Sequence, residues 1–155
     1  MKRMAHAIAG IAALLLVAAF LAGTIYAELT MDEILIAETK RLILYGICLL
    51  IPAMAVTGGS GFSLARGRAG GLVDIKMKRM RMLAANGLVV MLPSAIWLHM
   101  LASEGSFGVT FVIVQIIEIA GGLVQVYLLG RNFRDGLKLS GRLRRIAPRK
   151  TKTAG

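Results

Sequence analysis

Four long stretches of uncharged, mostly apolar residues divide the chain, and short charged segments separate them. Each stretch is close to or above the roughly 20 residues that an α-helix needs to cross a bilayer. Helices satisfy their backbone groups internally in lipid, whereas a transmembrane β-barrel would show short alternating segments. The pattern predicts an all-α integral membrane protein with four transmembrane helices in an up-down bundle. The expected spans are residues 5–27, 42–60, 82–103 and 108–130, forming one domain, 1–130, before a basic tail, 131–155.

The last apolar stretch carries polar side chains on a helical period. Gln115, Glu118, Gly122 and Gln125 follow one another at spacings of three and four, so they share one face of a helix. An ionisable group at bilayer depth costs a few kcal/mol or more and faces other helices or a water-filled cavity. Two interpretations stay open: Glu118 binds a proton or cation, or it is a hydrogen-bonded residue that holds helices together.

The third stretch offers partners for this polar face. At about 1.5 Å per residue, Asn86 lies near the inner surface, while His99 lies about 5 Å below the outer surface. On the same ruler Gln115 is about 9 Å deep and Glu118 about 13 Å deep. We therefore expect His99 to reach Gln115 directly and Glu118 only through water or a tilt, although an interfacial histidine without a special role is an alternative. The candidate intramembrane polar site is Glu118, Gln115, Gln125, Asn86 and His99.

Charge is distributed in a way that indicates orientation. The formal net charge is +11, which taken alone suggests nucleic acid, but basic segments alternate with acidic ones between the stretches. The positive-inside rule then places both termini and the middle loop in the cytoplasm, with the protein in the inner (plasma) membrane. Nucleic acid is not favoured as a partner, because Phe133 is the only aromatic residue in the basic tail. The residues expected to contact anionic lipid head groups are Lys76, Lys78, Arg79, Arg81, Arg131 and Arg134.

Three connecting features set the expected helix ends. The segment Glu28–Arg41 mixes apolar and acidic residues, so it forms either an amphipathic helix on the membrane surface or an extension of the second span. Pro52 is expected to kink the second helix and the glycine cluster Gly58–Gly61 to end it. That cluster lacks the Lys-Ser/Thr ending of a phosphate-binding loop, which favours a cytoplasmic turn. A helix is expected to begin again at Leu72 and to continue into the third span.

Both ends of the chain allow further expectations. The apolar start, residues 1–27, resembles a secretory signal peptide, whose cleavage would leave three spans, but its apolar region is longer than is typical. In the basic tail, Gly136, Gly141 and Pro148 are expected to interrupt any long helix. Alanines make the first helix a small-residue rod that can pack closely against a neighbour.

Other kinds of chemistry find little support. Cys48 is the only cysteine, so an intramolecular disulfide and a cysteine metal cage are excluded. His6 and His99 are expected on opposite membrane faces, which disfavours a haem held by both within one subunit. We expect no metal, no cofactor and no enzymatic activity, because no catalytic motif or paired carboxylates appear.

Three functions remain. The first is a small membrane accessory, assembly or interaction subunit, whose partner is a second copy or another membrane protein. The second is a proton- or cation-coupled transporter that works as an oligomer, with Glu118 as the titrating carboxylate and Asn86 or His99 assisting. The third and weakest is haem or quinone binding between subunits through His99.

Overall fold

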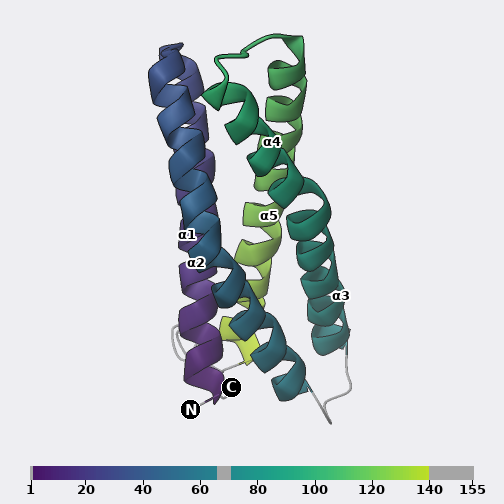
Figure 1. The fold of residues 1–155 in the computed structure, drawn as a ribbon. Coiled ribbons are helices and arrows are strands. Elements are labelled where there is room, and N and C mark those ends of the chain that lie inside the picture. The colour runs from purple at the N-terminus through teal and green to yellow at the C-terminus, as the bar shows by residue number, and fades with distance from the viewer. Residues whose placement is uncertain (1, 66–70, 140–155) are drawn as a thin grey trace, which may run out of the picture.

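The computed structural model describes residues 2–65 and 71–139, and it confirms an all-α protein. Four long helices pack as a bundle, each long and apolar enough to cross a membrane. Successive long helices run in opposite directions (Figure 1). The elements are α1 (Lys2–Thr30), α2 (Glu33–Ala65), α3 (Gly71–Ala85), a π-helical segment η1 (Asn86–Met91), α4 (Leu92–Ser103) and α5 (Val109–Leu139); α3, η1 and α4 together form the third long helix.

The two ends of the bundle differ in charge. One, here called the acidic end, holds the α1–α2 and α4–α5 connections; the other, the basic end, holds the start of α1 and the ends of α2 and α5 (Figure 1). The acidic end carries Glu28, Asp32, Glu33, Glu38 and Glu104. The basic end carries Lys76, Lys78, Arg79, Arg81, Arg131, Arg134 and Lys138.

At the acidic end, α2 begins well before its apolar run. The Asp32 carboxylate accepts hydrogen bonds from the backbone N–H groups of Ile34 and Leu35, at 2.9 and 3.2 Å, and so caps the helix. Met31, with φ of 54°, makes the sharp turn from α1. The segment Glu28–Arg41 is therefore the end of α1 and an extension of the second span, and the separate surface helix is not formed.

At the basic end, the prediction that Gly58–Gly61 ends the second helix is wrong, because α2 continues to Ala65. Each glycine destabilises a helix by roughly 1 kcal/mol, but each backbone group left unpaired in lipid costs several kcal/mol, so the helix continues. The neighbouring α1 also supports this stretch. His6 Nδ1 lies 3.1 Å from the Thr57 carbonyl oxygen and 3.0 Å from Ser60 Oγ.

Helix α5 likewise passes its expected limits. It runs through Gly130, where the basic tail was expected to begin, and the prediction that Gly136 interrupts the helix is wrong. The extension ends at Leu139 and contains Asp135, which pairs with Arg79 of α3. The predicted breaks at Gly141 and Pro148 lie outside the described residues.

The π segment in the third long helix follows from Pro93. Proline has no N–H, and its ring would collide with the carbonyl of the residue four positions earlier in a regular α-helix. Each turn of this segment instead contains about one more residue than an α-helical turn. The Leu92 N–H accordingly bonds to the Gly87 carbonyl, five positions back. Such π segments occur frequently at functional sites, and this one begins at Asn86.

The exterior of the bundle is apolar, and the interior combines two apolar clusters with several buried polar residues. Helix α1 packs along α2 and α5, α2 also packs against α4, and α5 contacts α3, η1 and α4. Large apolar side chains cover the outside, as expected for a lipid-facing surface. The buried polar residues are Thr24, Lys40, Ser94, Gln115, Glu118, Gln125, Asn132 and Asp135.

Close contact between α5 and η1 depends on Gly121. A β-carbon placed there would lie 2.8 Å from Met91 Sδ and 3.3 Å from Val90 Cγ1. We expect Gly121→Val to lower the free energy of unfolding by about 1–3 kcal/mol, the usual cost of overpacking. Steric-trap unfolding in bicelles measures this. Gly130→Val on the same helix, where nothing lies within 4 Å, is the matched control and should not destabilise; equal losses for both variants would contradict the packing explanation.

Candidate functional site

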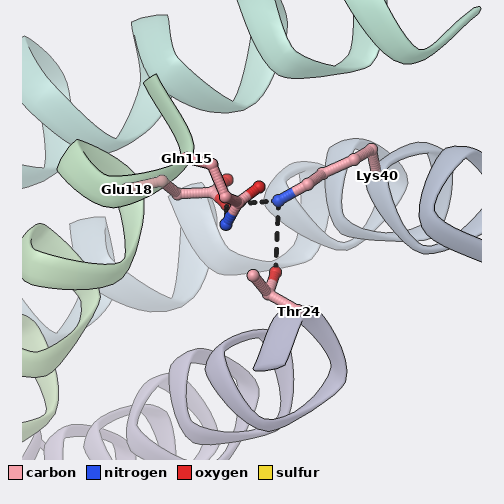
Figure 2. A network of polar contacts seen from close by, with 4 residues as sticks. All are labelled: Thr24, Lys40, Gln115 and Glu118. Atoms are coloured by element: carbon pink, nitrogen blue, oxygen red, sulfur yellow. Dashed lines mark hydrogen bonds and ion pairs between the residues drawn. The ribbon is translucent and has the colours of Figure 1, made fainter. Parts of the chain in front are cut away.

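A buried ion pair joins α2 to α5. The Lys40 ammonium lies 2.5 Å from Glu118 Oε2, and the two side chains are only 1% and 6% exposed. Figure 2 shows Gln115 and Glu118 pointing toward Lys40 from the opposite side of the bundle interior. Glu118 is thus neutralised by a lysine of the same chain.

Two further polar groups complete this cluster, which we call the Lys40 site: Thr24, Lys40, Gln115 and Glu118. Lys40 Nζ donates to Thr24 Oγ1 of α1 at 3.4 Å, and Gln115 Nε2 donates to Glu118 Oε2 at 3.3 Å (Figure 2). A buried ion pair recovers its desolvation cost only when geometry is good and further hydrogen bonds are made. The site therefore ties α1, α2 and α5 together at one level.

Lys40 is absent from the predicted polar site because a charged residue usually marks the start of a membrane span. Since α2 begins at Glu33, Lys40 lies about 10 Å along the helix, close to the depth of Glu118 from the start of α5. A usable signal was present. Ile36, Lys40 and Ile43 are spaced by four and three and are all buried, whereas Arg41 is exposed.

A second polar contact joins η1 to α5. Asn86 Nδ2 donates to Gln125 Oε1 at 2.7 Å and to the Gly121 carbonyl at 3.0 Å. Gln125 Nε2 in turn donates to the Leu83 carbonyl at 3.4 Å. Asn86 and Gln125, two members of the candidate intramembrane polar site, therefore bond to each other, whereas Glu118 bonds with Lys40.

A cavity of about 70 Å³ within the bundle has two of the polar residues of α5 on its wall, Glu118 and Gln125. Thr24 and Gly122 also line it, and the rest of the wall is apolar. A water molecule needs roughly 10–15 Å³ of such space and two or more polar partners. The cavity thus has room for several water molecules between the Lys40 site and the Asn86–Gln125 contact.

The two histidines lie at opposite ends of the bundle. His6 is near the basic end, bonded to α2, and His99 is near the acidic end of α4. His99 is half-buried, and its Nδ1 atom has no hydrogen-bond partner among the described residues. Gln115 Oε1 is also buried and unpartnered within that part of the chain, so the expected bond between His99 and Gln115 is not formed.

The expected lipid-contact residues divide into two groups. Arg79 donates to Asp135 at 2.5 Å with side-chain exposures of 15% and 7%, so it is engaged inside the protein, and Lys76 is half-buried. The Arg131 guanidinium lies 5.8 Å from the centre of the Tyr127 ring. The exposed members are Lys78, Arg81, Arg131 and Arg134.

Within residues 2–65 and 71–139, no group of three or more histidine, cysteine, aspartate or glutamate residues is placed to hold a metal ion. Cys48 is exposed on α2. Comparison of the chain with protein families, with curated proteins and with solved structures finds no match.

Removal of Lys40 tests the importance of the buried pair. We expect Lys40→Met to lower the free energy of unfolding by about 3 kcal/mol, because it leaves Glu118 buried without its counter-charge. The double variant Lys40→Met/Glu118→Met should be less destabilised than Lys40→Met alone, because two apolar side chains leave no buried charge without a partner. Steric-trap unfolding in bicelles measures both.

The matched control for this change is Arg41→Met. Arg41 is the adjacent cation on the same helix and pairs with Glu38 at 2.5 Å, but the two side chains are 51% and 47% exposed. An exposed pair contributes about 0–1 kcal/mol, so this variant should unfold almost as the wild type does. A loss for Lys40→Met no larger than that for Arg41→Met would contradict a stabilising role for the buried pair.

Proposed function

We propose that this small multi-pass membrane protein is a non-enzymatic interaction subunit, which acts by association with other helices in the membrane. The described connections are short, with residues 31–32 between α1 and α2 and 104–108 between α4 and α5. The main polar residues of α5 are already paired within the fold: Glu118 with Lys40, Gln125 with Asn86, and Asp135 with Arg79. Association with a partner therefore needs a different surface.

The outward side of α1 provides that surface, and it is the observation that carries the proposal. Its members are spaced alternately by three and four residues, the heptad pattern of helices that pack together. Ile8, Leu15 and Tyr26 are 61%, 63% and 65% exposed. Alanine recurs at every seventh position, which lets a second helix approach closely. This α1 outer face consists of Ala5, Ile8, Ala12, Leu15, Ala19, Ala22 and Tyr26.

The partner that this face fits is an apolar transmembrane helix with small residues of its own, from a second copy or from another membrane protein. Within this chain, α1 uses its other side, including Ala13, Val17 and Ala27, to pack inward. We infer that the protein lies in a plasma membrane with its basic end on the cytoplasmic side. The charge difference between the two ends of the bundle supports this orientation.

A second candidate function is proton- or cation-coupled transport. It is favoured by the cavity of about 70 Å³, which places space for water beside Glu118 within the bundle. Gln125, on the same wall, accepts a hydrogen bond from Asn86 at the start of η1. Haem or quinone binding between subunits through His99 stays a prediction from the sequence, and no contact of His99 supports it further.

Bulky substitutions on the α1 outer face test the interaction proposal. We expect Ala12→Ile and Ala19→Ile to weaken association about tenfold or more, since overpacking costs about 1–3 kcal/mol. Single-molecule photobleaching of labelled protein in native-membrane vesicles counts the copies per complex, and cross-linking detects another protein. Ala55→Ile, at an exposed alanine of α2, is the matched control. A chain that is monomeric and cross-links to nothing would contradict the proposal.

Reconstitution tests the transport candidate. In liposomes that contain a pH-sensitive dye, an imposed potassium-diffusion potential should drive proton entry through the wild type. Glu118→Gln should reduce that flux at least about tenfold, because the amide cannot take up and release a proton. Glu104→Gln, at an exposed residue of the acidic end, serves as control. Wild-type flux equal to that of protein-free liposomes would reject transport.

A further inference from the structure

A second carboxylate, Glu28, lies near the Lys40 site. It is on α1, one helical turn beyond Thr24, and Thr24 Oγ1 accepts from Lys40 Nζ, so Glu28 shares the face of α1 that borders Lys40. Glu28 Oε1 is buried and has no hydrogen-bond partner among the described residues. Lys40 thus pairs with Glu118, while Glu28 offers a second carboxylate on the neighbouring face of α1.

The charges of this group do not balance. Two ionised carboxylates and one ammonium would leave one net negative charge, shared between the buried Glu118 and the half-buried Glu28, and a charge that is partly removed from water is costly unless it is paired. Nearby groups do not supply the missing charge. Arg41 is exposed and paired with Glu38, and Glu33 would add negative charge. On α4, His99 has no bond to either carboxylate in the described structure.

An unpartnered polar atom independently indicates room for a ligand at this place. Gln115 is 5% exposed, its Oε1 atom has no partner within the described chain, and its side chain points toward Lys40 (Figure 2). The Lys40 ammonium has three N–H groups, of which the described contacts use two, to Glu118 and Thr24. A buried acceptor and a spare donor therefore adjoin a region of excess negative charge.

The site also has a route to the acidic end. A surface hollow of about 390 Å³ opens there, and Glu28 lies on its wall together with Glu33 and Ile36. Phe111 of α5 and Phe107 of the segment before it also line the hollow. Because Glu28 borders this hollow and lies one helical turn from Thr24, the Lys40 partner on α1, we expect a cation from the water at this end to approach the buried pair by way of Glu28.

We propose that Glu28, Lys40 and Glu118 form a binding site for one positive charge, a proton in the first instance. The proposal deepens the transport candidate by naming the site of the coupling ion, but proton binding itself does not require transport. A proton from water adds to a carboxylate oxygen and gives a neutral carboxylic acid. Lys40 pairs with whichever carboxylate is ionised, so a proton on Glu118 turns the ammonium toward Glu28.

This charge count predicts how many carboxylic acids the protein holds at neutral pH. Difference infrared spectroscopy in a bilayer detects each through its carbonyl band, which shifts in deuterated water. We expect one such acid in the wild type and none in Glu28→Gln, where Lys40 and Glu118 balance. Lys40→Met should double the band, because neither carboxylate then has a counter-charge. Glu33→Gln and Glu38→Gln, at exposed carboxylates of the same end, are the matched controls and should keep the wild-type band.

Sodium identifies the occupant. If the carboxylic-acid band is present in both sodium-containing and choline buffers, the bound charge is a proton. If the band appears only without sodium, the bound charge in sodium buffer is the alkali cation. Either result supports the site. Absence of the band in both buffers, or its full retention in Glu28→Gln, would overturn the proposal. Glu28 is only half-buried, so its glutamine variant is expected to fold, which circular dichroism checks. A band without proton flux in liposomes would reject transport alone, and flux without a band would reject this site alone.

Discussion

The ion pair between Lys40 and Glu118 constrains the rest of the bundle. Moving two charges out of water carries an effective cost of several kcal/mol for each ion, and a bilayer offers no water to reduce it. The pair is therefore stable only where α2 and α5 bring the two groups to the same level. Thr24 adds α1 to this requirement. A slip of one helical turn, about 5.4 Å, along any of these helices would separate the charges.

Helix α5 extends this principle along its whole length. Glu118 selects α2 through Lys40, Gln125 selects η1 through Asn86, and Asp135 selects α3 through Arg79. In lipid, apolar side chains gain little by contacting one another instead of acyl chains, so polar contacts and close packing decide which helices are neighbours. Glu118 thus fixes the position of α5 against α2, and Gln125 and Asp135 fix it at two levels of the third long helix. These pairs join α5, the helix with the most buried polar residues, to α2 and to the third long helix.

The sequence predicts the parts of this structure that depend on one helix at a time. The number of spans and the shared face of Gln115, Glu118 and Gln125 follow from length and period alone. Helix ends were less predictable, because charges and glycines usually stop a span, whereas Lys40 and Asp135 lie inside helices with partners. Partners themselves were not predictable. Depth along a helix can be counted, but rotation toward a neighbour depends on the packing of all four helices together.

The cavity beside the ion pair shows a compromise between packing and charge. Protein interiors are usually close-packed, and a methyl or larger group at Gly87 or Gly122, both on the cavity wall, would reduce this void. Filling it would add apolar contacts, but it would also leave Glu118 without space for water on that side. Water molecules in the cavity would stabilise the carboxylate and also provide the partners through which a proton moves. Water in this space would therefore lower the cost of the buried charge that holds α2 and α5 together.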